Sequence, residues 1–129
     1  MRMRMNVLVV DDNKMDRIVV RAALNRLGIH DVTEAENGSV AEGKMRTALE
    51  MGKHFDLAIV DWNMPMNNGL SLLRNIRSSA KLKSCRVIMM TATSEKKIVN
   101  EAIIEGVDDF IVKPVLLETL GEKIEKLFP

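Results

Sequence analysis

The features that would point to a disulfide scaffold, a nucleic acid or a membrane are missing from this chain of 129 residues. It has a single cysteine, Cys85, which excludes an internal disulfide and fits a reducing compartment. Nineteen basic residues stand against eighteen acidic ones, and a net charge of +1 favours neither nucleic acid nor an anionic membrane as a partner. Only four consecutive apolar residues follow Asn6, too few for a signal peptide and far short of the ~20 residues that cross a bilayer. We therefore expect a cytoplasmic monomer.

Other absences bound the domain organisation. No G-x-G-x-x-G follows the first apolar run, which excludes a dinucleotide-binding fingerprint. No segment is rich in proline, repetitive or low in complexity, and a chain of this length can bury roughly two-thirds of its unfolded surface. The sequence predicts one domain over residues 1–129, with no output domain.

Strand-like and helix-like segments alternate five times, which predicts an α/β fold with a doubly wound parallel sheet and helices on both faces. The expected strands are Val7–Val10, Val32–Ala35, Leu57–Val60, Val87–Met90 and Phe110–Val112. The expected helices cover 14–27, 39–51, a segment after the turn Asn67-Asn68-Gly69, 95–105 and 117–128. Gly28, Gly52 and Gly106 stand where helices are expected to stop.

Three helices carry more specific expectations. The first is expected to pack through one apolar face, which consists of Met15, Ile18, Val19, Ala22 and Leu27. The second is expected to begin with a capping box between Ser39 and Glu42. The fourth has an apolar arc made of Ile98, Val99, Ala102 and Ile103, and Ile104 falls about 100° beyond that arc, off the buried face.

Four of the apolar runs end in a residue suited to phosphoryl chemistry. Asp11 and Asp12 follow the first run, Asp61 the third, Thr91 the fourth and Lys113 the fifth. The carboxyl ends of parallel strands share one edge of an open sheet, and ligands bind in the crevice outside that edge. The five side chains are therefore expected to converge on one small site.

Crowded carboxylates repel one another and lose hydration, and a divalent cation offsets both costs. Asp11, Asp12 and Asp61 are oxygen ligands of the kind that Mg²⁺ prefers, and this ion typically uses only one or two protein carboxylates. One carboxylate then remains free as a nucleophile that forms an aspartyl phosphate. Lys113 would pair with a phosphoryl oxygen, and the Thr91 hydroxyl would donate a hydrogen bond.

Each of these residues also has a plainer interpretation. An Asp or Thr after a strand is often the N-cap of the next helix, and a Lys before Pro is often a solvated loop residue. Five such residues at the correct strand ends favour the phosphoryl site over five independent coincidences.

Short segments around these residues match a known family. They are Val9-Val10-Asp11-Asp12, Glu34-Ala35-Glu36-Asn37-Gly38, Asp61-Trp62-Asn63-Met64-Pro65 with Asn68-Gly69-Leu70, Met90-Thr91-Ala92, and Val112-Lys113-Pro114. With them the chain resembles, over essentially its whole length, the receiver domains of two-component response regulators, and among these the stand-alone chemotaxis regulators of the CheY type. The resemblance implies a flavodoxin-like sheet with strand order 2-1-3-4-5.

The resemblance also implies roles for the site residues. Asp61 would be the phosphoacceptor, Asp12 the main metal-binding carboxylate with Asp11 assisting, and Asn63 would supply a backbone carbonyl to Mg²⁺. Lys113 would contact the phosphoryl group, and its bond to Pro114 is expected to be cis. Such a domain is a switch and not an ordinary enzyme, because it catalyses only its own phosphorylation and dephosphorylation.

The resemblance further implies partners and a switching surface. The phosphoryl donor would be a histidine kinase or a histidine phosphotransfer protein. Thr91 would be the switch hydroxyl and Phe110 the switch aromatic. The downstream protein would bind the fourth helix, fifth strand and fifth helix, where we expect Val99 and Ile104 to contribute.

Two positions depart from the chemotaxis pattern. Phe110 replaces a Tyr, so no phenol hydrogen bond can report the state, and Thr93 replaces an acidic residue at a position that, with Asn63, influences the lifetime of the phosphoryl group. Two other functions remain as alternatives for the same residues. A Mg²⁺-dependent phosphohydrolase would need a proton donor two residues after the nucleophile, where Asn63 stands, and a non-phosphorylated binding module would not need the intact site.

Overall fold

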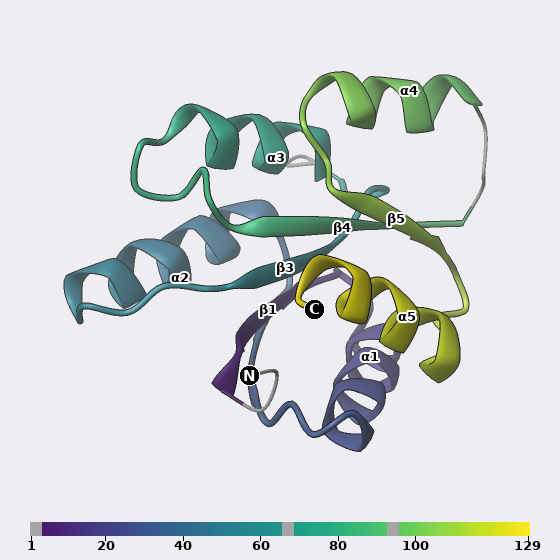
Figure 1. The fold of residues 1–129 in the computed structure, drawn as a ribbon. Helices are drawn as coiled ribbons and strands as arrows, with labels where there is room; N and C mark the ends of the chain where they lie inside the picture. Colours follow the sequence, from purple (N-terminus) through teal and green to yellow (C-terminus); the bar gives the residue numbers. More distant parts are fainter. Residues whose placement is uncertain (1–3, 66–68, 93–95) are drawn as a thin grey trace.

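The computed structural model describes residues 4–65, 69–92 and 96–129, in which strands and helices alternate along the chain (Figure 1). The strands are β1 (Asn6–Val10), β2 (Asp31–Ala35), β3 (Leu57–Asp61), β4 (Arg86–Thr91) and β5 (Asp109–Val112). The helices are α1 (Lys14–Arg26), α2 (Gly38–Glu50), α3 (Gly69–Ser78), α4 (Lys96–Ile104) and α5 (Leu117–Leu127). The predicted positions Asn67, Asn68, Thr93 and Glu95 lie outside the described ranges.

The strands form one parallel sheet in the order β2-β1-β3-β4-β5, which confirms the predicted fold. In the register of the central strands, Val10 pairs with Val60, and Asp61 pairs with Met90. Thr91 pairs with Val112, directly before Lys113. The sheet thus brings Asp11, Asp61, Thr91 and Lys113 to a single edge, because all its strands run the same way.

Helices cover both faces of the sheet (Figure 1). Residues 7–10 of β1 are all fully buried, because successive side chains of a central parallel strand enter opposite hydrophobic clusters. Val7 and Val9 pack with α1 and α5, through Val20, Leu24, Leu120 and Ile124. Leu8 and Val10 pack with α2, α3 and α4, through Ala41, Met45, Leu72, Ile76 and Ala102. Across residues 4–65, 69–92 and 96–129, no helix is long and apolar enough to cross a membrane.

The predicted glycine stops are confirmed, because Gly28, Gly52 and Gly106 have φ angles of 87°, 73° and 94°, a region that glycine enters at little cost. The predicted capping box was wrong. The N-cap of α2 is Asn37, whose side chain accepts a hydrogen bond from the Val40 N–H at 2.9 Å. Ser39 is therefore already inside the helix, because an equally good cap stands two residues before it.

The predicted buried face of α1 was also wrong. Met15, Ile18 and Val19 are 66%, 44% and 45% exposed, whereas the helix buries Val20, Ala23 and Leu24. The helix has two apolar arcs, and the periodicity does not say which of them meets the sheet. Two ion pairs determine which arc meets the sheet. The guanidinium groups of Arg17 and Arg21 bind the Glu34 carboxylate on β2 at 2.9 and 2.8 Å, and these contacts fix the rotation of α1 about its axis.

The fourth helix also differs from its predicted pattern at one position. Its burial is centred on Ala102, with Ile98 and Val99 partly covered. Ile103 lies about 100° around the helix from Ala102 and is 59% exposed, so it does not belong to the buried arc. Ile104 is 82% exposed, as predicted.

Candidate functional site

Asp11 follows β1 and is fully buried. Its Oδ1 accepts a hydrogen bond from the Asn13 N–H at 2.9 Å, and its backbone N–H donates to the Ala35 carbonyl at 3.0 Å. Asn13, and not an aspartate, caps α1 through its own bond from the Asp16 N–H at 3.0 Å. This capping leaves the carboxylates of Asp11 and Asp12 to the crevice, which removes the plainer interpretation of these two residues.

Asp61 is the last residue of β3 and is 4% exposed. Its Oδ1 accepts a hydrogen bond from the Asn63 N–H at 3.2 Å. Burial and the nearby charge of Asp11 raise the pKa of Asp61 from 3.8 to about 6, although Lys113 and the Asn63 N–H act in the opposite direction. Ionisation of Asp61 therefore costs the folded protein free energy.

The three aspartates form one cluster. Asp11, Asp12 and Asp61 each offer a carboxylate oxygen, and these oxygens all lie within 4.8 Å of one another. Two of the three side chains are buried, whereas Asp12 is exposed toward the solvent. Their repulsion, visible in the raised pKa of Asp61, is of the kind that a bound cation relieves. An all-oxygen, anionic donor set fits a hard divalent cation, so the residues present fit a metal.

Lys113 projects into this cluster from the loop after β5. Its peptide bond to Pro114 is cis, as predicted, and its backbone N–H donates to the Thr91 carbonyl at 2.8 Å. The ammonium lies 2.8 Å from Asp11 Oδ2 and 3.5 Å from Asp61 Oδ2. Burial alone would lower the pKa of Lys113, but hydrogen bonds to Asp11 and Asp16 outweigh it and raise the pKa above its usual value. Lys113 is therefore a firmly charged cation within the acidic cluster.

The sequence did not identify one charged residue of the site. Asp16 stands in the first turn of α1, and its Oδ2 is 2.9 Å from the Lys113 ammonium. A pattern of residues at strand ends does not include Asp16, because it lies within a helix. The signal was nevertheless available, since the first turn of the helix after β1 must begin at the same edge of the sheet.

The other predicted residues are placed as follows. Thr91 is fully buried at the end of β4, one residue beyond the Met90 that pairs with Asp61. Asn63 follows Asp61 with an exposed side chain. Phe110, in β5, is partly buried against the hydrophobic cluster between the sheet and helices α2, α3 and α4. The Lys123 ammonium lies 5.4 Å from the centroid of its ring.

Trp62 directly follows Asp61 and is 6% exposed, so it belongs to the core more than to the rim. Its ring explains the glycine of the Asn-Gly-Leu segment. A Cβ at Gly69 would lie 2.6 Å from Trp62 Cε3 and 2.8 Å from the Asp61 carbonyl oxygen. Only glycine lets α3 begin this close to the end of β3.

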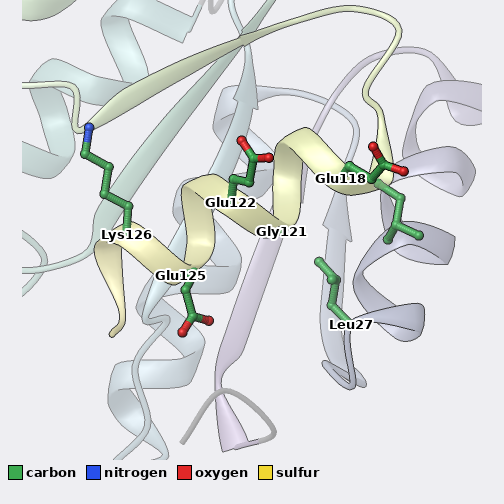
Figure 2. Close-up of a pocket in the computed structure, with 7 residues that line it drawn as sticks. Leu27, Glu118, Gly121, Glu122, Glu125 and Lys126 are labelled. Atoms are coloured by element: carbon green, nitrogen blue, oxygen red, sulfur yellow. The ribbon is translucent and has the colours of Figure 1, made fainter.

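Two of the hollows in the described part of the chain lie along α5. A groove of about 350 Å³ runs along β5 and α5, lined by Phe110, Val112, Pro114, Leu116, Thr119 and Lys123 among others. A more open groove lies on the outer side of α5 beside Leu27, where Glu118, Glu122 and Glu125 border Gly121 (Figure 2). Neither groove is lined by Asp11, Asp12 or Asp61.

Comparison with known proteins gives the same assignment. A family model of the response regulator receiver domain matches residues 7–125. Chemotaxis protein CheY-3 of Vibrio cholerae is 40% identical over 126 residues, which cover 96% of this chain and 92% of the relative. The solved structure of CheY4 of Vibrio cholerae has a TM-score of 0.86 at 28% identity, covering 96% of this chain and 98% of the other.

A second solved structure adds a bound state. CheY of Borrelia burgdorferi, in a complex with CheX, BeF₃ and Mg²⁺, has a TM-score of 0.86 at 27% identity, covering 97% of this chain and 90% of the other. The acidic cluster of this chain lies at the carboxyl ends of the strands. The chain therefore belongs to the response regulator receiver domain family and is a component of two-component signalling.

Proposed function

We propose that Asp61 accepts a phosphoryl group from a histidine kinase or a histidine phosphotransfer protein, and that this modification switches a partner-binding surface. The observation that carries the proposal is the cluster of Asp11, Asp12 and Asp61 oxygens within 4.8 Å, with the Lys113 ammonium 3.5 Å from Asp61. We also propose that Asp11, Asp12, Asp61 and the Asn63 backbone carbonyl hold Mg²⁺. The Borrelia relative supports this choice of ion, since its complex includes BeF₃ and Mg²⁺.

The residues divide the work of the transfer. The Asn63 N–H holds one oxygen of the Asp61 carboxylate, which is ionised above a pKa of about 6 and so is nucleophilic near neutral pH. An Asp61 oxygen forms a bond to phosphorus while the bond from phosphorus to the donor's imidazole nitrogen breaks. The imidazole keeps the electron pair and takes up a proton. When bound, Mg²⁺ would neutralise charge on the transferring oxygens.

The new phosphoryl oxygens then need partners. Lys113 supplies a charge-assisted hydrogen bond, and the Thr91 hydroxyl supplies a second contact from the end of the neighbouring strand. Movement of Thr91 toward Asp61 would leave room that the partly buried Phe110 ring can fill. This differential contact would bias two pre-existing conformations, as a switch requires.

We infer that the signal leaves through α4, β5 and α5. Ile103 and Ile104 are 59% and 82% exposed on α4, and Leu116 is 61% exposed beside the β5–α5 groove. Such exposed large apolar side chains are suited to a protein partner. The buried free thiol of Cys85 fits our expectation of a cytoplasmic location.

Acetyl phosphate and Mg²⁺ provide the direct test. Wild type should gain the mass of one phosphoryl group, which base should remove as it does from acyl phosphates. Asp61→Asn should remain unmodified, and Asp31→Asn, which removes an exposed carboxylate at the other end of the sheet, should be labelled like wild type. Full labelling of Asp61→Asn would show that another residue is the acceptor.

The same experiment separates the two other functions. A phosphohydrolase would turn over many equivalents of a phosphate ester, but the residue two positions after Asp61 is Asn63, whose amide cannot deliver a proton. A binding module without phosphorylation would show no mass gain. The family match and the intact acidic cluster favour the phosphorylated switch.

A further inference from the structure

Lys113 is shared among three carboxylates, and the sharing is uneven. Its ammonium lies 2.8 Å from Asp11 and 2.9 Å from Asp16, but 3.5 Å from Asp61. Two of its three N–H donors are thus engaged before any phosphoryl group arrives. We propose that Asp16 is a positioning residue, which holds the Lys113 ammonium while Asp61 is unmodified and releases it to the phosphoryl group. This inference rests on the proposed function of Asp61.

The burial of Asp11 and Asp16 determines which of these carboxylates can release the Lys113 ammonium. The Asp11 side chain is fully buried, so in the metal-free protein losing the ammonium would leave it with an uncompensated charge. The Asp16 side chain is 43% exposed, so water can replace the ammonium at a small cost. Asp16 is also held by its backbone, because its N–H donates to the Asn13 cap. Release therefore needs only rotation of side chains.

Asp16 should accordingly compete with any anion bound at Asp61. Lys113 must give up part of its bond to Asp16 before it can reach a phosphoryl oxygen, so the Asp16 carboxylate weakens the modified state. Beryllofluoride is the probe, since it mimics the phosphoryl group without a transfer step. Asp16→Asn should bind beryllofluoride roughly twofold to fivefold more tightly, the range of a partly exposed ion pair.

The matched control separates this contact from simple charge. Glu36→Gln also removes one exposed carboxylate, one residue beyond β2 at the same edge of the sheet, and Glu36 is not among the carboxylates within ion-pair distance of Lys113. At about 0.15 M salt the screening length is about 8 Å, so Glu36→Gln should bind beryllofluoride nearly as wild type does. If Asp16 competes directly for Lys113, the effect of Asp16→Asn on beryllofluoride affinity must also vanish in a protein that lacks Lys113.

The experiment titrates beryllofluoride at saturating Mg²⁺ and follows Trp62 emission. Wild type, Asp16→Asn, Glu36→Gln, Lys113→Met and the double variant Asp16→Asn/Lys113→Met are compared. We expect Asp16→Asn to bind more tightly than wild type, and the double variant to match Lys113→Met. An unchanged or weaker affinity of Asp16→Asn, or the same gain without Lys113, would overturn the inference. If wild type binds no beryllofluoride, the proposed function fails and this inference fails with it.

Discussion

Replacing Asp61 by Asn should stabilise the metal-free protein at neutral pH, even though it removes the proposed acceptor. The carboxylate is buried beside Asp11, and its pKa is raised from 3.8 to about 6. The folded state therefore binds more protons than the unfolded state between these two values. The associated stability is present below the unfolded pKa and is lost as the pH rises through the folded pKa. An amide has no such cost, and it can still accept the Asn63 N–H.

The size of the effect follows from the shift. About two pKa units at roughly 1.4 kcal/mol each set an upper bound of about 3 kcal/mol at pH 7.5. Asp12 beside Asp61 is exposed, so solvent screens the site in part, and Asn loses the attraction of Lys113 at 3.5 Å; we therefore expect a net gain of about 1–2 kcal/mol. Linkage predicts that about a third of the gain remains at pH 4.5, where most native Asp61 is already protonated.

Urea unfolding in EDTA, at pH 7.5 and 4.5, measures this difference. Asp31→Asn is the control, because it removes a carboxylate that is exposed. Added Mg²⁺ should narrow or reverse the gap, since a ligand of the folded state stabilises it by mass action and the variant lacks one proposed ligand. The reasoning would be refuted by an Asn variant that is less stable than wild type at pH 7.5, or by a gain that does not shrink at pH 4.5.

Three further predictions concern single residues. Gly69→Ala should destabilise the protein by about 1–3 kcal/mol, because the new Cβ would lie 2.6 Å from the Trp62 ring. Gly43→Ala should stabilise it by about 0.5–1 kcal/mol, because nothing lies within 4 Å of the new Cβ and alanine favours a helix. Equal urea midpoints of the two variants would contradict both predictions. Burial raises the pKa of the Cys85 thiol to about 12, so iodoacetamide at pH 8 should label it only after unfolding, and rapid labelling of the native protein would contradict its burial. Mg²⁺ should change the emission of Trp62, which adjoins Asp61, and Asp12→Ala should weaken that response; identical titrations would remove Asp12 from the metal site.

The sequence was sufficient for the sheet and for the residues at its edge. A parallel topology forces the carboxyl ends of all strands together, so a residue after an apolar run has a known position even when its neighbours in space are distant in the chain. This is why the sequence alone predicts one site for Asp11, Asp61 and Lys113, which lie up to 102 positions apart in the chain.

Helices offered no comparable constraint. Apolar periodicity locates a stripe but does not choose between two stripes, and on α1 the choice was made by the two arginines that bind Glu34. A capping pattern likewise does not choose between neighbouring candidates, and Asn37 capped α2 ahead of Ser39. Both errors arose where a local pattern had a competitor a few residues away.

The least predictable property of the site is how its single ammonium is divided among its carboxylates. The division depends on differences of tenths of an ångström and on unequal burial: Asp11 and Asp16 lie at 2.8 and 2.9 Å from Lys113, yet one side chain is fully buried and the other is 43% exposed. The proposed transfer needs Lys113 to stay charged and close to Asp61 without neutralising it. A second, partly solvated carboxylate meets both needs, because it holds the ammonium by a bond that water can replace. Under the proposed function, the residue identities at the strand ends specify the chemistry, whereas Asp16, a helix residue outside the family's motif, is expected to set how readily the modified state forms.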